Sequence, residues 1–321
     1  MNDEQNIALG IIGGAAVGDA LGAPLEFMPP RTPGNFVTEM IGGGMLKWKP
    51  GETTDDTIMA LAITDMYLEK GGYDQGTILE KWGAWQQRNP KDIGAWTHKV
   101  LGKWGQYRDR SRVLRGTDNP AVKLWQQQGS RDAGNGAVMR CMPTAVARRN
   151  DEQRLIEETM WLAEDTHPDP RSVLSCVVIN SLLRLGFLGV SKDEALEGVQ
   201  AILKSSSNPQ SILGNNFDLF DALQTAPTHQ WENWKNGGYT VDTVKCAVAA
   251  WYQNDNFEEG LVKVVNRGND SDSVGAVAGA LLGAYHGFKS IPQRWWDALG
   301  TDMNVRLVDN TNGLLQIGRQ S

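Results

Sequence analysis

Apolar residues recur at spacings of three and four along most of the chain, which is the period of a helix with one buried face. Period-two alternation, which would indicate half-buried strands, is scarce. Turns rich in Gly, Pro, Asn and Asp separate the helical stretches, and residues 205–236 are rich in loop-forming residues. We therefore expect a compact all-α domain spanning residues 1–321. The pattern predicts helices over 7–22, 57–68, 151–164, 171–188, 193–203, 241–253 and 271–288.

Two of these expected helices carry glycine at every fourth position. Each glycine inside a helix costs roughly 1 kcal/mol relative to alanine, but a stripe of them lets another backbone approach closely. Close core packing is the simplest interpretation. Both stripes also adjoin acidic residues, so we expect the two helices to meet near the chemical centre of the molecule. The stripes are Gly10, Gly14, Gly18 and Gly22, and Gly275, Gly279, Gly283 and Gly287.

Composition narrows the classes of function. The 321 residues are 40% hydrophobic and 21% charged, with a net charge of −7, so we expect no nucleic-acid partner. The N-terminus is polar and acidic, and no uninterrupted apolar run approaches the ~18 residues that span a bilayer, so we expect no membrane association. The three cysteines are far apart in sequence and suggest no disulfide framework, which favours a cytoplasmic location.

Two clusters of acids and hydroxyls stand at expected helix starts. Capping of the helices explains part of this pattern. Carboxylates and hydroxyls are also the ligands that Mg²⁺ or Mn²⁺ prefers, and four carboxylates converging without a cation would repel one another. A zinc site is disfavoured because no His/Cys constellation accompanies the acids, and the second cluster lacks the closing Glu of an EF-hand loop. The clusters are Thr54, Asp55 and Asp56, and Asp270, Asp272 and Ser273.

Three further features are candidates for ligand contact. Gly134-Asn135-Gly136 frees the backbone to approach a phosphate, although such a sequence is also a common turn. His167 follows an expected helix end, either as a turn residue or as a polar group that reaches substrate. Glu26 lies just past another helix end, where the helix dipole does not favour an acid, so a role in a site is worth considering. We also expect the tryptophans between residues 82 and 125 to lie mainly in the core, with Trp104 and Tyr107 as candidates for stacking on adenine.

Taken together, these motifs resemble the ADP-ribosylglycohydrolase family. They occur in the family's order and span residues 10 to 287, nearly the whole chain. One departure is Asn269 where the family often has glycine. The matching segments are Gly18-Asp19-Ala20-Leu21-Gly22 with Glu26, Thr54-Asp55-Asp56-Thr57, Gly134-Asn135-Gly136 with Met139-Arg140, Thr166-His167-Pro168 and Asp270-Ser271-Asp272-Ser273.

The resemblance implies an orthogonal helical bundle with a binuclear metal cleft that holds two Mg²⁺ ions, with Mn²⁺ as an alternative. By motif position, Gly134, Asn135 and Gly136 would lie along the pyrophosphate and His167 near the terminal ribose. Glu26 would stand on a mobile loop over the site. The implied metal ligands are Thr54, Asp55 and Asp56 from one side and Asp270, Asp272 and Ser273 from the other.

The function so implied is hydrolysis of the bond between ADP-ribose and a modified protein side chain, with arginine expected as the side chain. The partners would be an ADP-ribosylated protein as substrate and ADP-ribose as product. Asp55, Asp56 and Glu26 are the candidate catalytic acids and bases. Three alternatives stay open: cleavage of O-linked ADP-ribose on serine or of O-acetyl-ADP-ribose, binding of ADP-ribose without turnover, and a metal-dependent phosphatase or pyrophosphatase.

Overall fold

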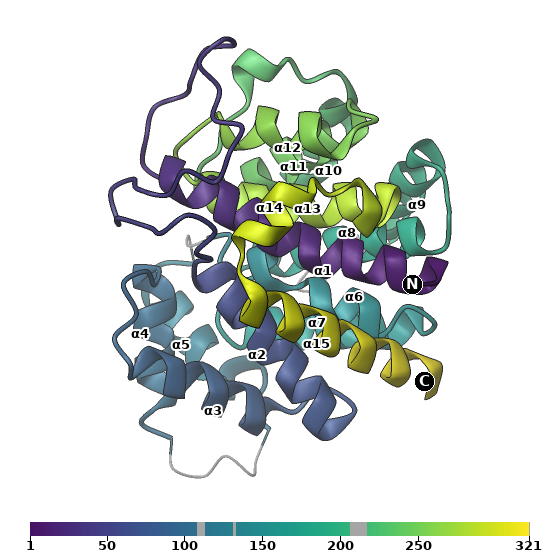
Figure 1. The fold of residues 1–321 in the computed structure, drawn as a ribbon. Coiled ribbons are helices and arrows are strands. Elements are labelled where there is room, and N and C mark those ends of the chain that lie inside the picture. Colours follow the sequence, from purple (N-terminus) through teal and green to yellow (C-terminus); the bar gives the residue numbers. More distant parts are fainter. Residues whose placement is uncertain (108–112, 131–132, 206–216, 321) are drawn as a thin grey trace.

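The computed structural model describes residues 1–107, 113–130, 133–205 and 217–320, which are mostly helical (Figure 1). Within these segments no β-strand forms, and the all-α fold class is confirmed. The helices are α1 (Asp3–Gly22), α2 (Asp55–Lys70), α3 (Gln75–Gln86), α4 (Ala95–Trp104), α5 (Pro120–Gln127), α6 (Met142–Ala147), α7 (Glu152–Glu164), α8 (Pro170–Phe187), α9 (Lys192–Ser205), α10 (Phe217–Thr225), α11 (Thr240–Tyr252), α12 (Phe257–Val265), α13 (Ser271–His286), α14 (Gln293–Ala298) and α15 (Thr301–Gln320).

The seven helices predicted from periodicity all form, as α1, α2, α7, α8, α9, α11 and α13. The periodicity misses α15, although this helix has 20 residues. Its buried face combines Leu307 and Leu314 with Asn310 and Thr311, so buried polar residues interrupt the apolar pattern. The prediction of a loop-rich segment over 205–236 is wrong where α10 forms, and residues 206–216 lie outside the described part of the chain.

The two glycine-striped helices, α1 and α13, pack against each other in opposite directions through the centre of the molecule (Figure 1). A Cβ on Gly14 would collide with the carbonyl oxygen of Gly279, and a Cβ on Gly18 would collide with that of Gly275. Further along, a Cβ on Gly22 would collide with the backbone of Ser271. The expected meeting of the two helices is therefore confirmed, and it brings the end of α1 to the start of α13.

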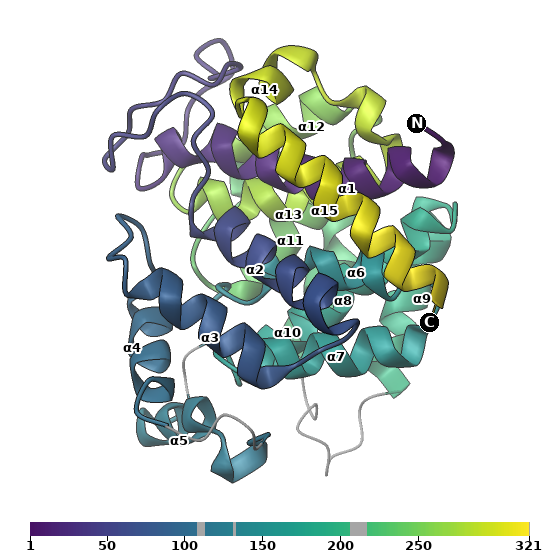
Figure 2. The ribbon, with the colours of Figure 1, turned by 60° about the horizontal axis from the view of Figure 1, so that its bottom comes forward.

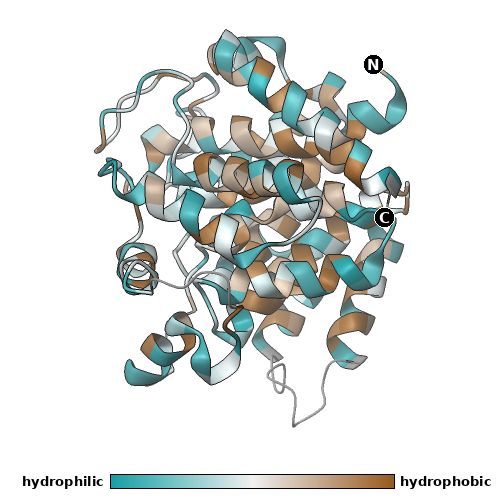
Figure 3. Cartoon of the chain, turned by 90° about the horizontal axis from the view of Figure 1, so that it is seen from below, coloured by the Kyte–Doolittle hydropathy of each residue, from teal (hydrophilic) through white to brown (hydrophobic). Residues whose placement is uncertain are grey.

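The remaining helices surround this pair. The C-terminal helix α15 packs against α1, α2 and α6, and the chain ends lie on the same side of the molecule (Figures 1 and 2). Helices α3, α4 and α5 form a side lobe next to α2 (Figure 2). Apolar residues concentrate on the central helices, and polar residues cover the outer ones (Figure 3).

The first helix is unusually apolar. Within the described residues, the segment Asp3–Leu25 has the length and composition of a membrane span. Its most apolar 18-residue stretch is nevertheless 89% buried inside the fold, as in a core helix. The three cysteines, Cys141, Cys176 and Cys246, are all free and buried, in line with the expected absence of a disulfide framework.

Candidate active site

The first acid cluster lies at the start of α2 and is held there by a buried aspartate of α1. Thr54 caps α2, because its hydroxyl accepts a hydrogen bond from the Asp56 amide at 3.3 Å. Asp19 accepts hydrogen bonds from the Thr54 amide at 3.0 Å and from the Thr57 hydroxyl at 2.5 Å. Asp19 thereby ties α1 to the first turn of α2, which fixes the direction in which Asp55 and Asp56 project.

The second acid cluster lies at the start of α13. Asp270 occupies the cap position, but its side chain makes no capping hydrogen bond, so the capping explanation is wrong for this residue. Its carboxylate accepts instead from the Asn135 side chain at 2.6 Å. The backbone N–H group of Asn135 in turn donates a hydrogen bond to the backbone carbonyl of Gly238 at 3.0 Å. The glycine-rich segment is therefore bound directly to the second acid cluster.

The two clusters converge on one cleft of about 570 Å³. Thr54 and Asp56 do not line this cleft. Each is 1% exposed, and Asp56 borders a small cavity behind the cleft, between α1, α2 and α13. The predicted site residues that line the cleft are Glu26, Asp55, Gly134, Asn135, Gly136, His167, Asp270, Asp272 and Ser273.

Sequence reasoning missed one acid of this site, Asp92. It lies in the loop before α4 and lines the cleft. One carboxylate oxygen each from Glu26, Asp92 and Asp272 lie within 4.8 Å of one another. The segment Pro90-Lys91-Asp92-Ile93-Gly94 has no motif that distinguishes this aspartate from an ordinary loop acid. Only the packing of the side lobe against α2 reveals it.

Burial and mutual repulsion raise the pKa values of the clustered acids. Burial, followed by repulsion from Asp272, raises the pKa of Asp56 well above 3.8, and Asp272 is affected in the same way by burial and Asp270. Burial, reinforced by the charges of Asp92 and Asp270, raises the pKa of Glu26 to about 8. Without a cation, these side chains therefore cannot all be ionised at neutral pH.

The donor set fits hard divalent cations. Both carboxylate oxygens of Asp56, one of Asp272, one of Glu26 and one of Asp92 are buried without a hydrogen-bond donor among the described residues. Buried carboxylate oxygens are normally hydrogen-bonded or bound to metal. Oxygen ligands contributed from two helix starts match the preferences of Mg²⁺ and Mn²⁺. Asp56 and Asp272 of the predicted ligand set therefore carry buried oxygens suited to a cation, and Glu26 and Asp92 supply further oxygens of the same kind.

The loop after α7 brings His167 to the wall of the same cleft. His167 is buried, and its Nδ1 atom lies 2.8 Å from the Thr166 hydroxyl. A Cβ on Gly136 would lie 2.7 Å from the Cε1 atom of this ring, so glycine is needed for the close approach. The glycine-rich segment and the histidine consequently form one continuous surface.

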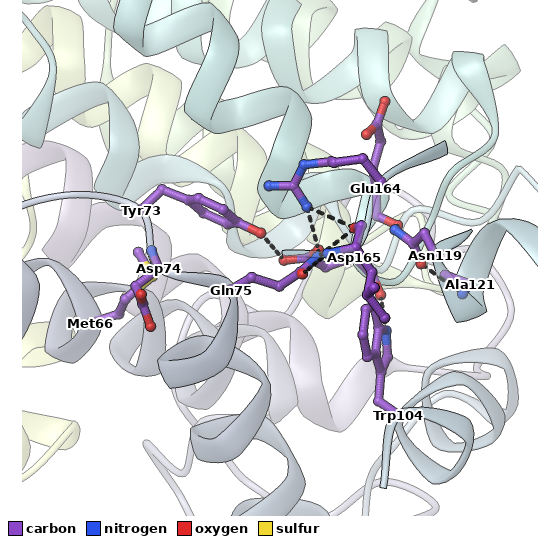
Figure 4. A network of polar contacts seen from close by, with 11 residues as sticks. Met66, Tyr73, Asp74, Gln75, Trp104, Asn119, Ala121, Glu164 and Asp165 are labelled. Atoms are coloured by element: carbon purple, nitrogen blue, oxygen red, sulfur yellow. Dashed lines mark hydrogen bonds and ion pairs between the residues drawn. The ribbon is translucent and has the colours of Figure 1, made fainter. Parts of the chain in front are cut away.

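The side lobe anchors this loop through a buried polar network around Asp165 (Figure 4). The Asp165 carboxylate accepts from the Tyr73 hydroxyl at 2.7 Å and from the Gln75 amide at 2.6 Å. Arg115 forms an ion pair with it at 3.3 Å. The Trp104 indole donates to the Asp165 carbonyl at 2.7 Å. The network fixes the backbone just before His167.

These contacts correct one expectation about aromatic residues. Trp104 is 6% exposed, its indole is engaged by Asp165, and it does not line the cleft, so it is not available to stack on a ligand. Tyr107 packs beside it and is likewise absent from the cleft lining. Trp96 lines the cleft instead, with its indole donating to the Thr166 carbonyl at 2.8 Å.

Comparison with known proteins gives the class to which this fold and cleft belong. A family model described as ADP-ribosylglycohydrolase matches residues 1–319. The chain belongs to the ADP-ribosylglycohydrolase family, and it is a hydrolase of glycosidic bonds to ADP-ribose.

The relatives include proteins whose names state a substrate. The chain is 31% identical over 299 residues to the ADP-ribosylarginine hydrolase Tri1 of Serratia proteamaculans, covering 91% of this chain and 75% of that protein. It is 31% identical over 316 residues to the ADP-ribosyl-(dinitrogen reductase) glycohydrolase of Rhodospirillum rubrum, covering 97% of this chain and 96% of that protein. A solved structure described as an ADP-ribosylglycohydrolase-related protein complex superposes with a TM-score of 0.82 at 29% identity, covering 99% of this chain and 100% of that chain.

Proposed function

We propose that this enzyme removes ADP-ribose from arginine side chains of modified proteins and requires two divalent cations, Mg²⁺ or Mn²⁺. The observation that carries the proposal is the convergence of five carboxylates on one cleft, from four separate parts of the chain. They are Glu26, Asp55, Asp92, Asp270 and Asp272. Two relatives named ADP-ribosylarginine hydrolase, at 31% and 29% identity, support the arginine linkage.

The leaving group favours the same conclusion. A guanidinium group is cationic, whereas a serine hydroxyl is neutral. Asp92 borders the cleft and is not among the ligands that the family motif implies, so its carboxylate adds negative charge to the wall that a cationic leaving group would meet. Local carboxylates of this kind attract a cation more effectively than the net charge of −7, which salt screens beyond about 8–10 Å.

The cations would be held by Thr54, Asp55, Asp56, Asp270, Asp272 and Ser273. When bound, they supply Lewis-acid chemistry that orients the ribose hydroxyls and lowers the pKa of a water molecule. On the protein side, Gly134, Asn135 and Gly136 give the diphosphate a backbone surface without side-chain obstruction, and metal also offsets the repulsion between an acidic cleft and an anionic ligand.

The reaction breaks the bond between ribose C1″ and the guanidino nitrogen and forms a bond from C1″ to a water oxygen. A carboxylate takes the proton from that water. Asp55 is better placed for this step than Asp56, because Asp55 lines the cleft and Asp56 lies behind it. Without a cation, burial and the neighbouring carboxylates raise the pKa of Glu26 to about 8, and we assign Glu26 as the acid that delivers a proton to the departing nitrogen.

The test compares turnover of arginine-linked and serine-linked ADP-ribosylated proteins, with products identified by mass. We expect intact ADP-ribose, faster release from arginine, and a fall in kcat of about 100-fold or more in Glu26→Gln, because a general acid contributes that much. Glu197→Gln, which changes an exposed acid on α9, is the matched control. Faster release from serine would overturn the linkage, and phosphate or AMP as product would indicate a phosphatase or pyrophosphatase.

A further inference from the structure

The buried guanidinium group of Arg140 contacts the loop that carries His167. Arg140 is 1% exposed, and among the described residues no carboxylate lies within ion-pair distance of it. Its guanidinium lies 4.2 Å from the centre of the Trp82 ring. Its Nη2 atom donates a hydrogen bond to the Thr166 hydroxyl at 2.5 Å. Burying an unpaired charge is unfavourable, so this position calls for an explanation beyond packing.

The contact with Arg140 determines what the Thr166 hydroxyl can do next. Its oxygen accepts from Arg140, and its own proton needs an acceptor. Within the described part of the chain, the other partner found for this hydroxyl is His167 Nδ1, at 2.8 Å. If Nδ1 carried a proton, the buried Thr166 proton would have no acceptor, which is unfavourable. The hydroxyl therefore donates to Nδ1, and the imidazole proton belongs on Nε2.

The protonated edge of the ring faces the ligand cleft. His167 lines the cleft, and its Nε2 atom would lie 2.8 Å from a Cβ on Gly136. The ring is also kept neutral, because burial, followed by the charge of Arg140, lowers the pKa of His167 well below 6.5. A neutral imidazole that accepts through Nδ1 has a single donor, Nε2–H, and no free lone pair.

We propose that Arg140 and Thr166 are positioning residues that fix His167 in the Nε2–H tautomer, so that the ring donates a hydrogen bond to an oxygen of the ADP-ribosyl group. The identity of that ligand rests on the proposed function, whereas the tautomer follows from the protein alone. It also follows that His167 is not the general base, and that the proton of the attacking water goes to a carboxylate.

The first test is the tautomer itself. Protein labelled with ¹⁵N-histidine, free of substrate, is examined by long-range ¹H–¹⁵N NMR, and the His167 signals are assigned by their loss in His167→Gln. We expect Nε2–H in the wild type. Thr166→Val keeps the shape but removes the hydroxyl, so the ring should move toward Nδ1–H, while Thr166→Ser should preserve the wild-type pattern. An Nδ1–H ring in the wild type, or unchanged ring nitrogens in Thr166→Val, overturns the proposal.

The second test measures ADP-ribose affinity by calorimetry in the same variants. We expect Thr166→Val to bind roughly 3- to 10-fold more weakly, the effect of one hydrogen bond, and Thr166→Ser to bind close to wild type. Circular dichroism confirms that each variant is folded. Unchanged affinity in a Thr166→Val protein with an altered tautomer contradicts the donor role. Failure of the proposed function would appear separately, as a lack of ADP-ribose release by wild type.

Discussion

Gly18 of α1 and Gly275 of α13 lie so close together that the carbonyl oxygen of each occupies the space that a side chain on the other would need. The contact sets the register of the two helices. Asp19, next to Gly18, holds the start of α2, and Asp270 and Asp272 stand at the start of α13. Backbone packing at the centre of the fold therefore determines how far apart the two acid clusters lie.

Substituting these glycines by alanine should lower the stability of the fold. Gly14→Ala places a methyl group against the Gly279 carbonyl, which belongs to another helix and cannot move alone. We expect a loss of at least about 3 kcal/mol in the free energy of unfolding, at the upper end of the usual cost of overpacking. The control is Gly83→Ala in α3, where a Cβ meets nothing within 4 Å. Helix propensity predicts that this control gains about 0.5–1 kcal/mol. Denaturant unfolding measures both, and similar values for the two variants would contradict the packing.

The backbone conformation of Asn269 explains why asparagine can stand where the family motif often has glycine. Its φ is +53°, a left-handed conformation that asparagine adopts more readily than other residues with a side chain. We expect Asn269→Gly to be tolerated and Asn269→Ala to lose about 1 kcal/mol of stability. Thermal unfolding of the pair measures the difference. Greater stability of the alanine variant would show that this backbone conformation is wrong.

Cation affinity should depend on pH. Because burial and mutual repulsion raise the pKa values of Asp55, Asp56 and Asp272, the metal-free site carries protons that a cation must displace. Affinity for Mg²⁺ should therefore increase as pH rises, with proton release on binding. Calorimetry in buffers of different ionisation enthalpy measures the release. Affinity independent of pH would contradict the clustered acids.

The Asp165 network gives a pH effect away from the metal site. Burial raises the pKa of Asp165 to about 6 despite the ion pair with Arg115. The folded state thus binds the proton more tightly than the unfolded state, and stability falls as pH rises from about 4 to 6. Relative to Asp165→Asn, the wild type should lose up to roughly 3 kcal/mol in this window, the equivalent of the change from 3.8 to about 6. If the wild type instead gains stability relative to Asp165→Asn as pH rises from about 4 to 6, the ion pair with Arg115 outweighs the effect of burial on Asp165.

The sequence predicts the parts of this molecule whose signals are local. Apolar periodicity predicts α1 and α13, and their glycines predict the close pairing. The acid–hydroxyl motifs predict two groups of residues that do converge. Asp92 and Trp96 are not predictable in this way, because their place in the cleft depends on how the side lobe packs against α2. The role of Arg140 depends on a contact between residues 26 positions apart.

The most direct test of the central claim is release of intact ADP-ribose from an arginine-linked protein substrate as Mg²⁺ is returned to enzyme stripped with EDTA. We predict no release without the cation, saturable recovery as Mg²⁺ is added, and loss of recovery in a folded Asp272→Asn variant, because that carboxylate has a buried oxygen without any other partner among the described residues. Full release in excess EDTA, or recovery in Asp272→Asn equal to that of wild type, would contradict the account.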